Sequence, residues 1–282
     1  MKNDFGLEVQ NLNVVYPNGK IALNNVSFKI PRGTITGLVG INGAGKSTVF
    51  KAIMGFVKYH SGSVKIFNKN IKIALKNNLV AYVPQSEDID WNFPILVKDV
   101  VMMGRYGKMN FLRIPDYNDK EEVLLSLKKV KMQDFLSRQI GELSGGQRKR
   151  VFLARALAQK AKIILLDEPF SGVDVKTEEA IFELLCELRS RGKIILIATH
   201  NLGSVTRYCD RSILVKQSII ANGPTKKIFT RKNLELAFGG VLRHFVLEGD
   251  DLHQDEDKRS IRVISDDERP FIMYTDEEQE LK

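Results

Sequence analysis

Residues 40–48 carry the side-chain types that bind phosphate groups: Gly40, Ile41, Asn42, Gly43, Ala44, Gly45, Lys46, Ser47 and Thr48. An apolar run at 35–39 precedes this stretch, and 47–54 has the pattern of a helix beginning. Glycines let several backbone N–H groups turn toward one anion, and a helix N-terminus adds the positive end of its dipole. We therefore expect a phosphate-binding loop in which Lys46 contacts nucleotide phosphates and the Ser47 hydroxyl ligates Mg²⁺.

Two later segments end in side chains that suit phosphate chemistry. Residues 163–166 are apolar and precede Asp167 and Glu168, and the apolar stretch 194–199 precedes His200. Both segments have the pattern of buried strands, and ligands bind at the carboxyl ends of strands in open α/β sheets. We expect Asp167 to hold Mg²⁺ and Glu168 to orient and deprotonate an attacking water. A single strand-end histidine is more often structural, but its place at this edge favours contact with a terminal phosphate.

A second glycine-containing segment has the form of an anion-binding helix N-terminus: Leu143, Ser144, Gly145, Gly146 and Gln147. It directly precedes a segment with helical spacing, 151–157. The basic run 148–150 at the start of that helix is either a solvated face or a weak nucleic-acid patch.

The remaining pattern predicts a mixed α/β chain with a helical insert. Strands are expected at 7–15, 21–30, 63–67 and 79–83, and helical spacing dominates from about 88 to 159. A helix at 175–191, a hairpin within 211–221, short helices within 224–238 and a β-like stretch at 261–264 complete the pattern. The apolar loop 111–115 either faces a partner or packs as an ordinary loop.

Composition fits a chain with a substantial core: of 282 residues, 43% are hydrophobic and 27% are charged. No stretch approaches the roughly 20 apolar residues of a membrane-spanning helix, and the first residues lack a secretory-signal pattern. Cys186 and Cys209 form no metal or disulfide framework, which suits a reducing compartment.

Charge is unevenly distributed along the chain. The net charge is +9, but residues 241–282 hold 13 acids and 6 bases, net −7, so residues 1–240 carry net +16. Such a basic body suits nucleotide phosphates, nucleic acid or an anionic membrane surface, and charge alone does not choose among them.

The order and spacing of these motifs resemble the ATP-binding subunits of ABC transporters. The resemblance covers about 7–235 and includes Gln85 after a strand, the segment 143–147, and Ser-Gly-Val-Asp ending at Asp174. It implies an α/β fold: a RecA-like P-loop ABC ATPase core with an antiparallel β subdomain and an inserted α-helical subdomain. The implied domains are an ATPase domain at 1–240, with the helical subdomain at about 88–159, and an acidic C-terminal extension at 241–282.

The resemblance also implies roles for individual residues with ATP and Mg²⁺ as cofactors. Tyr16, at a predicted strand end, would stack on adenine, although an isolated tyrosine there is more often a core aromatic. Gln85 would sense Mg²⁺ and the attacking water, and His200 would hold the γ-phosphate. Residues 143–147 would close over ATP bound to the opposite protomer of a head-to-tail homodimer, and Asp174 would organise the dimer contact.

A narrower resemblance, carried by 83–94, 103–107 and 238–242, is to ATPase subunits of bacterial importers for chelated iron, manganese or zinc. It is closest to the iron/manganese branch. It implies ATP hydrolysis that powers metal import, with permease subunits and an extracytoplasmic metal-binding protein as partners. The chain would lie peripherally on the cytoplasmic face of the inner membrane. Alternatives are transport of zinc or another small solute, or a non-transport ATPase acting on nucleic acid, although no nucleic-acid partner is expected.

Overall fold

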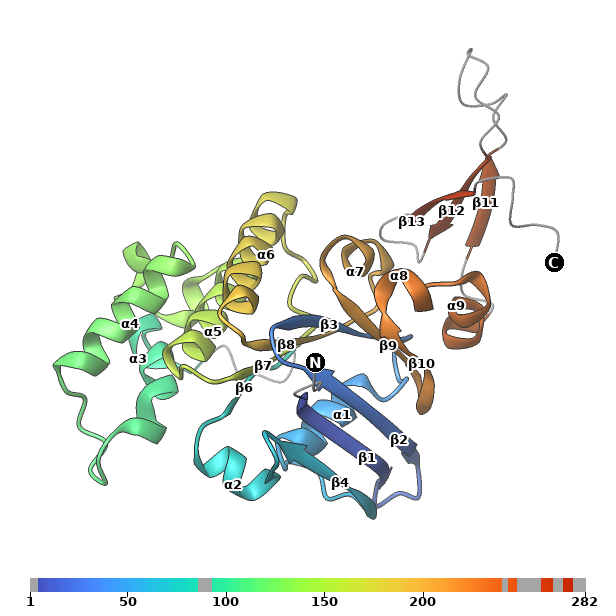
Figure 1. Ribbon diagram of the computed structural model, residues 1–282. Helices are drawn as coiled ribbons and strands as arrows, with labels where there is room; N and C mark the ends of the chain where they lie inside the picture. Colours follow the sequence, from blue (N-terminus) through green and yellow to red (C-terminus); the bar gives the residue numbers. More distant parts are fainter. Residues whose placement is uncertain (1–4, 86–92, 240–242, 248–259, 266–270, 276–282) are drawn as a thin grey trace, which may run out of the picture.

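In the computed structural model, which describes residues 5–85, 93–239, 243–247, 260–265 and 271–275, a six-stranded sheet lies at the centre (Figure 1). The strand order is β10-β9-β3-β8-β7-β6. Five strands are parallel, and β10 pairs antiparallel with β9 at one edge. Their bounds are β3 (Thr34–Val39), β6 (Val80–Val83), β7 (Ile163–Asp167), β8 (Ile194–Thr199), β9 (Arg211–Lys216) and β10 (Ser218–Pro224).

Both faces of this sheet are buried. In β7, Ile164 and Leu166 belong to the core shared with most of the helices, whereas Ile163 and Leu165 belong to the core on the opposite face. Helices α6 (Val175–Ser190) and α7 (Leu202–Tyr208) lie on one side of the sheet and α1 (Lys46–Ile53) on the other (Figure 1). Strands covered on both faces need apolar residues at every position, which explains the continuous apolar runs.

A smaller antiparallel sheet lies next to α1. It has the order β2-β1-β4-β5, with β1 (Phe5–Val15), β2 (Ile21–Pro31), β4 (Ser61–Ile66) and β5 (Lys69–Asn70). Gly19 adopts φ 78° and donates its N–H to the Tyr16 carbonyl at 2.9 Å, which closes the turn between β1 and β2. The predicted strands here are confirmed, whereas α2 (Ile71–Lys76), capped by the Asn70 side chain, was not predicted.

The segment between β6 and β7 forms the helical subdomain, at the left of Figure 1. It contains α3 (Val97–Met102), the 3₁₀ helix η2 (Met103–Lys108), α4 (Tyr117–Lys129), the single turns η3 (Gln133–Phe135) and η4 (Ile140–Glu142), and α5 (Gly145–Ala158). The inserted helical subdomain of the expected fold class is therefore confirmed. The expected start of the insert, residue 88, lies outside the described residues.

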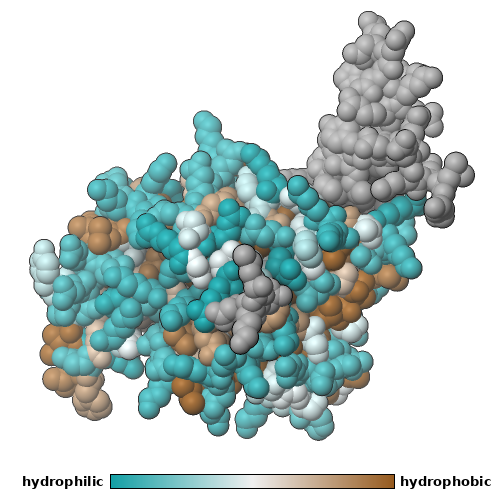
Figure 2. Space-filling view, in the orientation of Figure 1, coloured by the Kyte–Doolittle hydropathy of each residue, from teal (hydrophilic) through white to brown (hydrophobic). Residues whose placement is uncertain are grey.

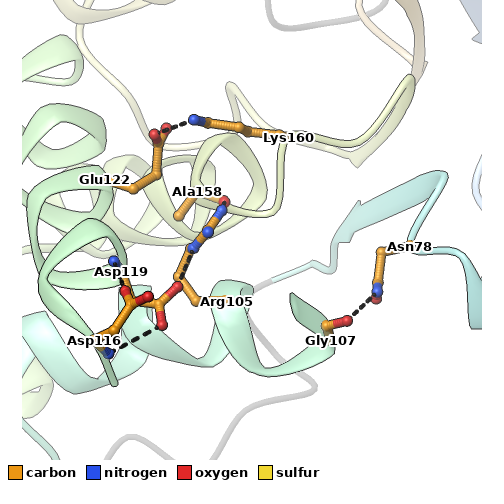
Figure 3. Close-up of polar contacts among 8 residues, drawn as sticks. All are labelled: Asn78, Arg105, Gly107, Asp116, Asp119, Glu122, Ala158 and Lys160. Carbon is orange, nitrogen blue, oxygen red and sulfur yellow. Dashed lines mark hydrogen bonds and ion pairs between the residues drawn. The ribbon is translucent and has the colours of Figure 1, made fainter. Parts of the chain in front are cut away.

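Polar contacts of η2 connect it to the other helices of the helical subdomain and to the core of the protein (Figure 3). The buried Arg105 places Nε 2.9 Å from Asp119 Oδ1 of α4 and donates from Nη1 to the Ala158 carbonyl of α5 at 3.0 Å. Asn78, just before β6, donates to the Gly107 carbonyl at 2.9 Å. A Cβ at Gly104 would lie 2.2 Å from the carbonyl oxygen of Arg155, so only glycine fits there. Segment 103–107 therefore joins α4, α5 and the edge of the central sheet.

Replacing Asp119 with Ala is expected to lower the free energy of unfolding by about 3 kcal/mol or more, because it leaves the Arg105 guanidinium buried without its partner. Urea unfolding of the full chain measures this. The double variant Arg105→Met/Asp119→Leu removes both charges and should recover much of the loss. An unchanged unfolding midpoint for Asp119→Ala would show that the ion pair contributes nothing.

The chain ends with short elements beyond β10. Helices α8 (Thr225–Ile228) and α9 (Arg231–Phe238) match the predicted short helices. A three-stranded sheet follows, β11 (Arg243–Leu247), β12 (Ser260–Ser265) and β13 (Phe271–Thr275), and its middle strand contains the predicted β-like stretch. Within the described part of the chain, no helix has the length and apolar character required to cross a bilayer.

Candidate functional site

The glycines of segment 40–45 form a tight loop between β3 and α1. A Cβ at Gly40 would lie 2.3 Å from the Val215 carbonyl oxygen. Gly43 and Gly45 adopt φ values of 81° and 103°, a region that L side chains avoid. The loop therefore needs glycine both for close packing and for its backbone path from β3 into α1.

Lys46, the first residue of α1, is 6% exposed and lies among oxygen atoms. Its Nζ donates to the Gly40 carbonyl at 2.7 Å and lies 3.5 Å from Oε1 of Glu168. Burial lowers the pKa of Lys46, and the negative charge of Glu168 opposes this shift. The arrangement places a cation beside the loop carbonyls, and a cation there suits phosphate oxygens.

Asp167, the last residue of β7, has a carboxylate oxygen with unused acceptor capacity. Its Oδ2 accepts from the Tyr82 hydroxyl at 3.3 Å, and Ser47 also donates to the carboxyl group. Its Oδ1 is buried and has no hydrogen-bond partner among the described residues. Burial raises the pKa of Asp167, and the hydrogen bond from Ser47 opposes the rise. A buried carboxylate oxygen beside a serine hydroxyl is the oxygen donor set that Mg²⁺ prefers, so the residues fit this ion.

Glu168 follows directly and occupies a constrained backbone position. It adopts φ 46°, which is unusual for a residue with a side chain, and its N–H donates to the Ala198 carbonyl of β8 at 3.0 Å. Its Oε1 lies 3.0 Å from Nδ1 of His200, just beyond the end of β8. The site thus presents a buried carboxylate held between an imidazole and the Lys46 ammonium, a suitable acceptor for a proton from water.

A pocket of about 430 Å³ opens over the loop. Tyr16, whose hydroxyl lies 3.1 Å from Oγ1 of Thr48, and Gln85 are among its lining residues. The residues that line it are Tyr16, Lys20, Ala22, Ile41, Asn42, Gly43, Gly45, Lys46, Ser47, Thr48, Gln85 and Glu168. The pocket thus combines an aromatic ring with phosphate-binding groups, the two kinds of group that suit a nucleoside triphosphate.

Segment 143–147 forms the start of α5. Ser144 caps this helix and forms a capping box with Gln147, whose Oε1 accepts from the Ser144 N–H at 2.9 Å. A Cβ at Gly145 would meet nothing within 4 Å, and one at Gly146 would reach only Val173 at 4.0 Å. No packing within the described chain therefore requires glycine at these two positions.

Comparisons with known proteins identify the family of this chain. Residues 23–171 match the family model described as ABC transporter. The chain belongs to the ABC transporter family. Over 268 residues it is 60% identical to the "Chelated iron transport system membrane protein YfeB" of Yersinia pestis, covering 95% of this chain and 90% of that protein.

Two further matches lie in the same family. The chain is 55% identical over 235 residues to the "Manganese transport system ATP-binding protein MntA" of Synechocystis sp., covering 83% of this chain and 90% of that protein. A solved metal-chelate type ABC transporter in an inward-facing conformation superposes with a TM-score of 0.75 at 27% identity, covering 96% of this chain and 97% of that one. The fold and the phosphate loop are thus those of an ABC nucleotide-binding subunit.

Not all residues singled out from the sequence meet in the pocket of this ABC subunit. The pocket brings together Tyr16, the loop, Gln85 and Glu168, with His200 adjacent to Glu168. Segment 143–147 and Asp174 are not among its lining residues. Asp174 instead caps α6, where hydrogen bonds from Thr177 hold its pKa below the usual range. Within one chain these elements form a second surface.

Sequence reasoning missed two residues that support the ABC site. Tyr82 was part of a predicted strand, and nothing in its spacing indicated the bond to Asp167. Lys149 belonged to a run interpreted as a solvated face or nucleic-acid patch, but its ammonium donates to the carbonyls of Glu168, at 3.1 Å, and Ser171. This contact holds α5 against the strand end that carries Glu168.

Replacing Gly45 with Ala is expected to weaken ATP binding at least tenfold, because the new Cβ would lie 2.8 Å from the Ala22 carbonyl oxygen and φ would be strained. Titration with a fluorescent ATP analogue measures this. Gly43→Ala is the matched control, since its φ is also positive but its Cβ would meet nothing within 4 Å. Equal losses in both variants would mean that backbone strain alone matters.

Proposed function

We propose that this chain hydrolyses ATP to power the import of a transition metal, manganese or iron, through a separate membrane permease. The observation that carries the ATPase assignment is Glu168, which lies within 3.5 Å of both Lys46 and His200 beside the phosphate loop. The cargo assignment is supported by the relatives named for chelated-iron and manganese transport, which align over most of this chain.

In the proposed reaction, a water molecule attacks the γ-phosphorus of ATP and transfers a proton to the Glu168 carboxylate, while the bond between the γ-phosphorus and the β–γ bridging oxygen breaks and ADP leaves with that oxygen. His200 orients that carboxylate and contacts the γ-phosphate. Lys46 and the loop N–H groups stabilise the negative charge on the phosphate oxygens, and the Tyr16 ring stacks on adenine. Catalysis rests on positioning and on electrostatic stabilisation of the transferring group.

Mg²⁺, when bound with ATP, would neutralise charge on the β- and γ-phosphates. Ser47, Asp167 and Gln85 are the residues that would hold it. The unpartnered Oδ1 of Asp167 supports this assignment, because a buried carboxylate oxygen is costly unless it meets a cation or a donor. Gln85 is also proposed to relay the state of the nucleotide to the permease.

The active form is proposed to be a head-to-tail homodimer. In this dimer, ATP bound on the phosphate loop of one chain contacts residues 143–147 of the other chain. Asp174 contributes to the contact between the two chains. The open surroundings of Gly145 and Gly146 support this arrangement, since they leave the N-terminus of α5 accessible to a phosphate from outside the chain.

The proposed setting is the cytoplasmic face of the inner membrane, with permease subunits and an extracytoplasmic metal-binding protein as partners. Residues 1–240 would form the ATPase domain, with its helical subdomain at about 88–159, and 241–282 an acidic extension. The bonds from Lys149 to carbonyls of its own chain reduce support for the nucleic-acid alternative.

Metal uptake in cells tests the proposal directly. Cells that carry this chain or its Glu168→Gln variant would be supplied separately with Mn²⁺, Fe²⁺ and Zn²⁺. Uptake of manganese or iron should fall with the variant. If only zinc uptake falls, the cargo assignment is wrong and the coupling stands. If ATP hydrolysis falls and no metal's uptake changes, metal import is excluded.

A further inference from the structure

The loop between η2 and α4 exposes an unusual set of large apolar side chains. Phe111 is 98% exposed, Leu112 70% and Ile114 61%, and Tyr117 at the start of α4 is 78% exposed. We call these four residues the apolar tip. Figure 2 shows hydrophobic surface gathered at the lower left, over the part of the helical subdomain where this loop projects in Figure 1.

The base of the loop is firmly held although its tip is not packed. The Arg105–Asp119 ion pair joins the two elements on either side of the loop, and Asp116 forms a capping box with Asp119 at the start of α4 (Figure 3). On the η2 side, Asn78 anchors the Gly107 carbonyl to the core. Buried polar contacts thus fix both ends of a loop that presents its apolar side chains to solvent. Such preorganisation lowers the cost of binding.

Charge and aromatic residues surround the tip in a definite pattern. The chain has no acidic residue between Asp99 and Asp116, and Lys108 and Arg113 are exposed on this stretch; on the α4 side, Lys120 is exposed together with Asp116 and Glu121. The Arg113 guanidinium lies 5.3 Å from the centre of the Tyr106 ring. Apolar side chains on a loop whose own charges are all positive, beside amphipathic tyrosines, are typical of segments that insert into the interface of an anionic bilayer.

We propose that the apolar tip inserts into the headgroup region of an anionic lipid bilayer. Phe111, Leu112 and Ile114 would enter the boundary between headgroups and acyl chains. The ring of Tyr117 would lie at headgroup level, and the three cations would contact lipid phosphates.

A bilayer fits these observations better than a protein partner does. The tip is a projecting loop, and residues 100–115 around it carry cations and no acid, so a broad surface that accepts apolar groups and carries negative charge complements it. An anionic bilayer does both without a preformed cavity. The inference rests on the proposed function only for the nearness of a membrane, since a transporter subunit works beside one.

Flotation of the purified full chain with lipid vesicles tests the inference without any permease. Vesicles would contain either phosphatidylcholine alone or equal parts of phosphatidylcholine and phosphatidylglycerol. The wild-type chain should bind the mixed vesicles more tightly. The variant Phe111→Ser/Leu112→Ser should bind them about tenfold more weakly, because it removes two inserted apolar side chains.

A matched control is available because Ile73 and Leu236 are also exposed, at 48% and 51%, on other elements. The variant Ile73→Ser/Leu236→Ser should bind vesicles like the wild type. ATP hydrolysis should be unchanged in both double variants, since none of the four residues lines the nucleotide pocket. ATP hydrolysis by the Glu168→Gln variant tests the proposed function separately. Failure of the ATPase proposal is therefore distinguishable from failure of the bilayer proposal.

A fluorescence measurement gives a second readout. The chain has one tryptophan, so Phe111→Trp in a Trp91→Phe background reports on the tip alone. Its emission should shift to shorter wavelength with the mixed vesicles. Equal flotation of the wild type and the Phe111→Ser/Leu112→Ser variant, or no emission shift, would overturn the inference. So would loss of permease co-purification in the tip variant with vesicle binding unchanged, because the tip would then face the permease.

Discussion

Replacing Glu168 with Gln is expected to lower the kcat of ATP hydrolysis by about 10²–10⁴-fold, the range typical for loss of a positioned general base. Gln has nearly the same size and can still bond to His200, whose Nδ1 lies 3.0 Å from Oε1. It cannot accept a proton from water at neutral pH. ATP binding should persist, because the phosphate loop and Lys46 remain.

Steady-state phosphate release and equilibrium binding of ATP measure the two quantities independently. Glu178→Gln is a suitable control, since Glu178 is also a buried glutamate, 2% exposed, but its Oε1 accepts from Ser204 Oγ at 2.7 Å on the far side of α6. That variant should retain turnover even if its stability falls. Turnover near the wild-type rate in Glu168→Gln would remove the residue from the catalytic role.

The local sequence pattern was sufficient to predict the strands of the central sheet and the phosphate loop. Strands β7 and β8 are buried on both faces, so every position before their last residues, Asp167 and Thr199, is apolar and the runs stand out from polar surroundings. The loop is similarly explicit, because Gly43 and Gly45 have positive φ values that require glycine independently of their contacts.

Features that depend on contacts between distant segments were not predictable. The Tyr82 hydroxyl reaches Asp167 across 85 positions of sequence, and the Arg105–Asp119 pair joins helices whose spacing indicates only that each is amphipathic. The short helices α2 and α7 depend on side-chain caps, from Asn70 and Asn201, more than on a long apolar period. For loop 111–115 the sequence left packing and partner contact equally open, and the 98% exposure of Phe111 in the structure decides against packing.

Replacing Gly146 with Asp, at the start of α5, is expected to leave the stability of the fold intact while lowering ATP hydrolysis. A side chain there meets only open space and Val173 at 4.0 Å, so no clash arises. Asp also has a higher helix propensity than Gly and interacts favourably with the helix dipole, by about 0.3–1 kcal/mol. The thermal unfolding midpoint should therefore stay the same or rise.

ATP hydrolysis by Gly146→Asp should nevertheless fall at least a hundredfold, because a carboxylate would repel the γ-phosphate that the partner chain presents to this helix. Binding of ATP to the variant's own pocket should be unchanged, since Gly146 does not line it. Gly146→Ala adds a methyl group without charge and should lose less activity, which distinguishes repulsion from steric exclusion. Wild-type turnover in Gly146→Asp would exclude this surface from the reaction. Because residues 143–147 do not line the nucleotide pocket of their own chain, a loss of turnover with intact binding and stability would support a second copy that completes the site.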